Sequence, residues 1–252
     1  MKTRLQYTAV LFFAAALFAA CSKDEVNKPE EEVVVPPKVI SECIKQDVKT
    51  GVYQVTNLPL TPTGGNYAQE IVKQYKVHKP LYFNFTTAAI VTEDKAAGLE
   101  WDVVFMDANT YHNSAILLNN GTINNRPWSQ NGSVVLAAYI AEDFDNVKNV
   151  PSDLNFTLKN VPPQSTSTPL ASSWAVYSYT EAGTFSYYIP QKNLTYVIKL
   201  NDGRYVKLCV QNVYQVADIT KPYESSATSV NGFITFKYFI APAGSKDLNT
   251  AK

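Results

Sequence analysis

The stretch Leu194–Tyr214 constrains the fold of this chain more than any other part, because its pattern is that of a β-hairpin. Apolar residues alternate on both sides of a central turn, at Tyr196, Ile198 and Leu200 and then at Val206, Leu208 and Val210. Alternate residues of a strand share one face, so each arm has a buried face. The dipeptide Asp202-Gly203 between the arms predicts a type I′ turn, since glycine accepts the positive φ that this turn needs.

Short apolar runs bounded by turn residues recur along the chain. They are Val52–Thr56, Leu81–Phe85, Trp101–Met106, Ala115–Leu118, Val134–Ile140, Leu154–Leu158, Trp174–Tyr179 and Gly232–Phe239. One segment, Asn66–Val77, fits a helix or a strand equally well. The 12% aromatic content suits strands. The sequence therefore predicts an all-β fold: a single antiparallel β domain, a sandwich or an open sheet, with few or no helices.

The N-terminus has the pattern of a lipoprotein signal peptide, predicted to span residues 1–20. Lys2 and Arg4 make a basic start, and the apolar run Ala9–Ala20 follows. This run is shorter than the roughly 20 residues of a membrane-spanning helix, and it fits the apolar region of a signal peptide. Small residues precede Cys21, as in the lipobox at which Gram-negative bacteria attach a lipid to cysteine. We expect Cys21 to be lipidated and to be the chain's only attachment to a membrane.

The residues after Cys21 suggest where the protein is exposed. The stretch Ser22–Glu25, a lysine followed by acids, resembles the export signal of surface lipoproteins, which places the protein on the extracellular side of the outer membrane. Residues 21–40 are polar and proline-containing, as in a flexible linker. The β domain is predicted over 41–241, and the polar tail over 242–252 is expected to fray.

Composition and motifs exclude several function classes. Lys plus Arg and Asp plus Glu are both 22, so the balance gives no reason to expect nucleic-acid binding. No zinc-protease, serine-hydrolase or phosphate-loop motif is present, and we expect no enzyme activity. A carboxylate pair for hydrolysis is defined only in space, so a hydrolase stays a weaker alternative. Besides Cys21 the cysteines are Cys43 and Cys209, and whether they form a disulfide is left open.

Several of these segments, in their order and spacing, resemble the HmuY family of haem-binding surface lipoproteins. They are Tyr82–Phe85, Trp101–Phe105, Tyr196–Leu208 and Gly232–Tyr238. The resemblance covers roughly residues 79 to 240 together with the leader. It implies an all-β, hand-like fold with the ligand held between strand ends and loops. It also implies capture of haem outside the cell and delivery to an outer-membrane transporter.

The resemblance carries over to the iron ligands only in part. The family pattern places one histidine in Trp-x-x-x-x-His, and the matching stretch here starts at Trp174 and ends at Tyr179. A second family histidine lies before that tryptophan, but no His or Met occurs here between Pro151 and Trp174. Tyr, Met and His all ligate haem iron, so Met106 and His112 are the candidate second contacts.

Two hypotheses from different classes follow. The first is a surface lipoprotein that binds haem or a related iron-bearing ligand for uptake, with Tyr179 as the lead ligand and Met106 or His112 beside it. The second is an accessory surface lipoprotein of the same fold that binds a protein or glycan partner without metal. Aromatic richness suits either, because flat apolar ligands and sugars both stack on aromatic rings.

Overall fold

The computed structural model describes residues 35–60, 81–95, 97–108, 112–119, 133–158, 160–161, 171–179, 186–217 and 231–251. Within these ranges the chain forms fourteen β-strands and one short 3-10 helix, η1 (Glu93–Lys95). The strand pairs within the described residues are all antiparallel, which confirms the predicted all-β, antiparallel fold class. The ambiguous segment 66–77 lies outside the described residues, as do residues 1–34 with Cys21.

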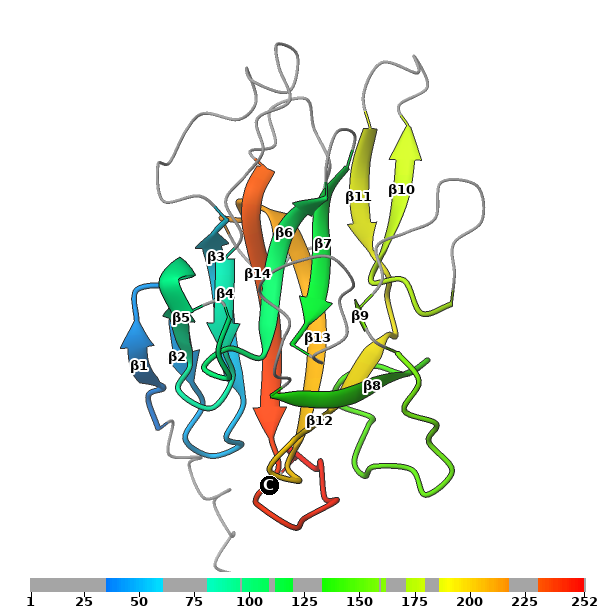
Figure 1. Ribbon diagram of the computed structural model, residues 1–252. Coiled ribbons are helices and arrows are strands. Elements are labelled where there is room, and N and C mark those ends of the chain that lie inside the picture. Colours follow the sequence, from blue (N-terminus) through cyan, green and yellow to red (C-terminus); the bar gives the residue numbers. More distant parts are fainter. Residues whose placement is uncertain are drawn as a thin grey trace, which may run out of the picture. The chain divides into compact units, whose positions relative to one another are not determined.

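The larger sheet has seven strands, in the order β1-β2-β3-β14-β13-β12-β8. Their bounds are Lys38–Ser41 (β1), Ile44–Gln46 (β2), Tyr53–Pro59 (β3), Asn231–Ile240 (β14), Tyr205–Tyr214 (β13), Thr195–Leu200 (β12) and Val134–Ile140 (β8). The ten-residue strands β13 and β14 run through its middle (Figure 1). Their length and central place make them the frame on which the rest of the sheet is built.

A second sheet has five strands, in the order β5-β4-β6-β7-β9, and a separate pair joins β10 to β11. The bounds are Leu81–Asn84 (β4), Ala89–Val91 (β5), Val103–Ala108 (β6), His112–Leu118 (β7), Asn160–Val161 (β9), Ala175–Tyr179 (β10) and Ser186–Pro190 (β11). The β6–β7 and β10–β11 hairpins both point toward the same end of the domain, at the top of Figure 1.

One core joins the two sheets. Phe83 and Phe105 come from the five-stranded sheet, and Phe236 and Tyr238 from β14. The ring centroid of Phe236 lies 5.5 Å from that of Phe83 and 5.2 Å from that of Phe105. Such aromatic pairs add about 0.5–1.5 kcal/mol each to the burial of their area. The segments on which the family resemblance rests therefore supply the contact between the sheets.

The predicted hairpin is confirmed, but its turn is of another type. The register pairs Tyr196 with Leu208 and Ile198 with Val206. Gly203 has φ +85°, whereas Asp202 is not among the residues with positive φ. A type I′ turn needs positive φ at both central residues, so that prediction is wrong. The connection is a three-residue loop over 201–203 that ends on a left-handed glycine, closed by a hydrogen bond from Leu200 N to Arg204 O (2.9 Å).

The predicted strand Leu154–Leu158 is wrong except at its last residue. Only Leu158 makes a β-bridge, with Ala137 of β8. The alternation has another cause: Phe156 packs beside Tyr205, with ring centroids 5.9 Å apart, so one side of the segment is half-buried without a neighbouring strand. Alternation of apolar residues indicates that one side of the segment is covered by other parts of the protein. It does not require a ladder of hydrogen bonds to a neighbouring strand.

The described part of the tail, 242–251, is not frayed. Leu248 is fully buried, and its N–H donates to the carbonyl of Lys148 at 2.7 Å. The N–H of Val150 in turn donates to the carbonyl of Lys246 at 2.9 Å. One apolar side chain and two backbone bonds therefore hold a stretch whose polar composition predicted mobility.

Cys43 and Cys209 are both free thiols. Cys209 lies on β13, whereas Cys43 directly precedes β2, and β3 and β14 lie between those two strands. Three strand spacings amount to roughly 14 Å. A disulfide needs Cα atoms within about 7 Å, so the sheet order keeps these two residues from pairing.

Lys207 of β13 is fully buried although lysine carries a charged amine. Its Nζ donates to the carbonyls of Phe144 and Val147, each at 2.9 Å, and lies 4.2 Å from the centre of the Phe144 ring. Lys237 covers the same ring at 4.5 Å and pairs with Asp145 at 3.2 Å. Burial lowers the pKa of Lys207 to about 8. These contacts fix the acidic loop after β8 against the sheet.

Candidate functional site

The β6–β7 hairpin starts from a buried tryptophan. Trp101 is fully buried, and its carbonyl accepts hydrogen bonds from Asn119 Nδ2 (2.8 Å) and Ser133 Oγ (2.6 Å). The next strand residues, Val103 and Phe105, are buried in the shared core. The base of this hairpin is therefore fixed by both packing and hydrogen bonds before it extends toward its turn.

The β10–β11 hairpin is built in the same way. Trp174 immediately precedes β10, is 1% exposed, and accepts a hydrogen bond at its carbonyl from Gln191 N (2.8 Å). The hydroxyl of Tyr196 on β12 donates to the carbonyl of Ser172. Burial raises the pKa of Tyr196 strongly, so this hydroxyl keeps its proton and stays a donor. Two hairpins with rigid bases thus extend toward one end of the domain.

The three sequence-predicted ligand residues lie on these two hairpins. Met106 pairs with Ala115 across β6 and β7, and His112 pairs with Ala108 two residue pairs closer to the turn. Tyr179 is the last residue of β10 and pairs with Ser186. The backbone therefore brings Met106 and His112 into one hairpin and puts Tyr179 on the other. Their side chains, and Cys21, lie outside the described part of the structure.

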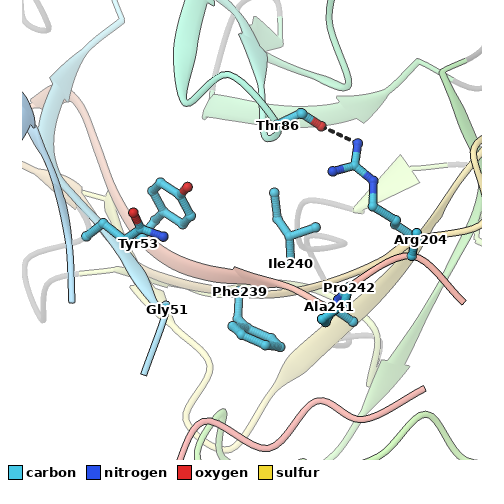
Figure 2. Close-up of a pocket in the computed structure, with 10 residues that line it drawn as sticks. Gly51, Tyr53, Thr86, Arg204, Phe239, Ile240, Ala241 and Pro242 are labelled. Atoms are coloured by element: carbon cyan, nitrogen blue, oxygen red, sulfur yellow. Dashed lines mark hydrogen bonds between the residues drawn. The ribbon is translucent and has the colours of Figure 1, made fainter. Parts of the chain in front are cut away.

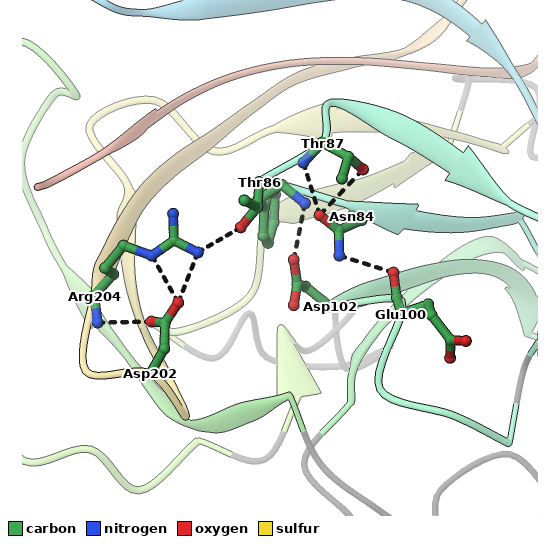
Figure 3. Close-up of polar contacts among 8 residues, drawn as sticks. Asn84, Thr86, Thr87, Glu100, Asp102, Asp202 and Arg204 are labelled. Carbon is green, nitrogen blue, oxygen red and sulfur yellow. Dashed lines mark hydrogen bonds and ion pairs between the residues drawn. The ribbon is translucent and has the colours of Figure 1, made fainter. Parts of the chain in front are cut away.

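A buried polar network lies at the opposite, fixed end of β6 (Figure 3). Asp102 is 3% exposed, and its carboxylate accepts the N–H of Phe85 at 2.8 Å. Burial raises the pKa of Asp102, and the hydrogen bond from Phe85 opposes that rise. Asn84 donates to the carbonyl of Glu100 at 2.8 Å. These contacts hold the turn after β4, which the sequence alone marked only as the end of an aromatic strand.

A pocket of about 560 Å³ lies beside that turn (Figure 2). Tyr53 and Ile240 line it from the seven-stranded sheet, and Thr86 lines it from the turn after β4. Arg204 closes one side, with its Nη2 donating to Thr86 Oγ1 at 2.7 Å. Arg204 directly follows the predicted Asp202-Gly203 turn, where the sequence indicated only a hairpin connection. The opposite charges of Asp202 and Arg204, two positions apart, were the available signal.

The described residues show neither a metal-binding cluster nor a membrane-spanning helix. They contain no group of three or more His, Cys, Asp or Glu side chains placed to hold a metal ion. Across the same ranges, no helix is long and apolar enough to span a membrane.

Comparison with known proteins identifies one family. The model of the HmuY protein family matches residues 76–238, more than half of the 252-residue chain. No curated protein sequence is similar enough to count as a relative.

Solved structures of similar chains include one from Bacteroides vulgatus, described as an HmuY-like haem-binding protein. It has 14% identity and a TM-score of 0.41, covering 77% of this chain and 94% of its own. A lipoprotein structure from Bacteroides fragilis has 14% identity and a TM-score of 0.38, covering 77% and 91%. An apo HmuY analogue from Tannerella forsythia has 13% identity and a TM-score of 0.31, covering 67% and 91%.

Proposed function

Because the chain belongs to the HmuY family, a family of binding proteins, we propose that it is a surface lipoprotein that captures haem or a related iron-bearing ligand for nutrient uptake. The family match over residues 76–238 is the observation that carries the proposal. It spans both hairpins that extend from buried tryptophans, so the matched region includes the proposed site as well as the core.

The proposed haem site lies where the β6–β7 and β10–β11 hairpins end. Tyr179 is the lead iron ligand, and Met106 or His112 supplies the second contact. Tyrosinate, thioether and imidazole are all ligands of haem iron, so the donor types fit this cargo. The rigid bases of the two hairpins support the proposal, because a binding site needs its ligand residues held in place by packing.

Attachment to the membrane is proposed through a lipid on Cys21. The linker after it would let the domain stand off the extracellular side of the outer membrane and pass its cargo to a transporter there. Replacing Cys21 by alanine should move the protein from the membrane fraction to the soluble fraction. Unchanged membrane association would refute lipid anchoring at this residue.

Haem binding is tested by titrating the mature chain with ferric haem and recording the Soret band. We expect a saturable shift near an equimolar ratio. Tyr179→Phe should move the band and weaken binding, while Tyr139→Phe, a control at an exposed tyrosine of β8, should change neither. No saturable shift in the unmodified chain would refute the haem proposal. A spectrum that Tyr179→Phe leaves unaltered would remove that residue from the site, and Met106→Leu and His112→Ala identify the second contact in the same way.

The second candidate is an accessory lipoprotein of the same fold that binds a protein or glycan partner without metal. The specific observation in its favour is Tyr179, which stands where the family pattern has histidine, together with the lack of His or Met between residues 151 and 174. This candidate predicts no Soret shift at any ratio, and normal folding of the chain without haem.

A further inference from the structure

The pocket beside Arg204 is far from the proposed haem site and has no part in it. It adjoins the C-terminal end of β14, at the bottom of Figure 1, whereas the two ligand-bearing hairpins point to the top. Strand β14 has ten residues, which corresponds to roughly 30 Å between its ends. Whatever this pocket binds is therefore separate from a ligand held by Tyr179.

One wall of the pocket includes a tyrosine ring that its neighbour holds in place. Tyr53 and Tyr238 are register partners on β3 and β14, with ring centroids 4.7 Å apart and planes only 6° from parallel. Tyr238 is fully buried, and its hydroxyl donates to the carbonyl of Phe85 at 3.1 Å. The buried ring therefore fixes the orientation of Tyr53, which is half-buried and lines the pocket. Ile240, two residues beyond Tyr238 on the same face, extends the apolar surface.

Polar groups converge on the same space. Gln46 is the register partner of Tyr53 on the side away from Tyr238, and its half-buried side chain lines the pocket. Within the described residues, neither the Gln46 amide nor the Tyr53 hydroxyl has a hydrogen-bond partner. The guanidinium of Arg204 uses Nε and Nη2 on Asp202 and Thr86, and its other terminal nitrogen points into the pocket in Figure 2.

The charge of the site selects the class of ligand. Asp202 lies 2.6 Å from Arg204 Nη2, so the guanidinium charge is already compensated. A neutral ion pair gives an anionic ligand little attraction, but its remaining N–H group still donates well to a hydroxyl. The volume of about 560 Å³ lies in the range of small-molecule sites, roughly 300–1,000 Å³. A neutral ligand with one apolar face and several hydroxyls matches this combination.

We propose that this pocket is a carbohydrate-binding site that takes a neutral hexose unit of a glycan. The C–H face of the sugar contacts Ile240 and the edge of the Tyr53 ring, because Tyr238 already covers one face of that ring, and dispersion and the loss of apolar surface from water favour this contact. The hydroxyls of the sugar form hydrogen bonds with the side chains of Gln46, Tyr53 and Arg204. The inference does not depend on haem binding, since it uses none of the haem-site residues.

The test measures sugar binding to the mature chain by saturation-transfer NMR and calorimetry. The probes are the methyl glycosides of glucose, galactose and mannose, with glucuronic acid as an anionic comparator. We expect saturable binding of at least one neutral glycoside at millimolar concentration. Tyr53→Leu should weaken it roughly tenfold and Gln46→Ala roughly threefold. Tyr139→Leu, at an exposed tyrosine outside the pocket, is the matched control and should leave binding unchanged.

Each outcome decides for or against the proposal. The proposal is overturned if none of the neutral glycosides binds, or if glucuronic acid alone binds. It is also overturned if the Tyr53→Leu and Gln46→Ala variants bind the glycoside as tightly as the unmodified chain. If Tyr53→Leu fails to fold because the stacked pair is lost, Gln46→Ala decides alone, since Gln46 is only half-buried and its side chain has no hydrogen bond within the described residues. The Soret titration of the same variants should match that of the unmodified chain, so failure here leaves the haem proposal untouched.

Discussion

The buried amine of Lys207 gives a prediction that can be worked out from the structure. The side chain is fully buried between β13 and the loop after β8, and its Nζ donates to two carbonyls, of Phe144 and Val147. Lys207→Met removes the charge and both hydrogen bonds while keeping a similar length of side chain. At one pH the result is a difference of opposing effects, because the lost hydrogen bonds, about 1–3 kcal/mol each, oppose the relief of not burying a cation. The change with pH isolates the charge.

The sign follows from the two pKa values. Lysine in the unfolded chain releases its proton near the ordinary pKa of 10.5, whereas burial lowers the pKa of Lys207 to about 8. Between these values the unfolded state binds more protons than the folded state, so the free energy of unfolding rises with pH. From about pH 7 to about pH 9.5 this linkage amounts to a gain of about 2 kcal/mol for the unmodified chain relative to Lys207→Met.

The assay is urea unfolding at both pH values, followed by tryptophan fluorescence. Buried tyrosines and thiols also titrate above pH 9, but they are present in both proteins and cancel in the difference. Lys45→Met, at an exposed lysine of β2, is the control and should show no such gain. If the difference between the unmodified chain and Lys207→Met is the same at both pH values, or shrinks with rising pH, the reasoning from burial is refuted.

Three further predictions concern the fold. Tyr238→Phe should lower the free energy of unfolding by about 1–2 kcal/mol in urea titrations, because the carbonyl of Phe85 loses its buried donor; no measurable loss would show that water replaces the hydroxyl. Leu248→Ala should cost about 2–3 kcal/mol in the same assay, since the side chain is fully buried, and a neutral effect would support a frayed tail. After air oxidation and denaturation, alkylation followed by mass spectrometry should find Cys43 and Cys209 both modified, whereas a mass corresponding to their disulfide would contradict the sheet order.

Much of the fold was predictable because alternation and turn residues are local properties. The hairpin Leu194–Tyr214 was placed correctly from its pattern, but its register was not: the predicted two-residue turn would pair Ile198 with Lys207, whereas the structure pairs Ile198 with Val206. Its turn type was not, because Gly203 is compatible with several turns and only the closing hydrogen bonds distinguish them. The strands that prediction missed, β1, β2, β5, β9 and β11, have two to five residues, too few for alternation to be recognised.

Candidate ligand residues could be named from the sequence, Tyr179 from the family pattern and Met106 and His112 from their donor atoms, and their role stays a prediction. That β6 and β7 pair to bring Met106 and His112 into one hairpin is a property of the register. The pocket beside Arg204 was not predictable at all. Tyr53 lies on β3 of the seven-stranded sheet and Thr86 in the turn after β4 of the five-stranded sheet, and nothing local in the sequence of either indicates the other.

The sequence by itself determined the all-β class, the family and the kinds of side chain available, because these depend on short-range pattern and on motif order. Only the tertiary structure decided which of those side chains meet. It separated Cys43 from Cys209 by two strands, buried the amine of Lys207 and stacked Tyr53 on Tyr238. The physical reason is that strand order and register join residues far apart in the chain, and the free energy that fixes them comes from a core shared by the two sheets.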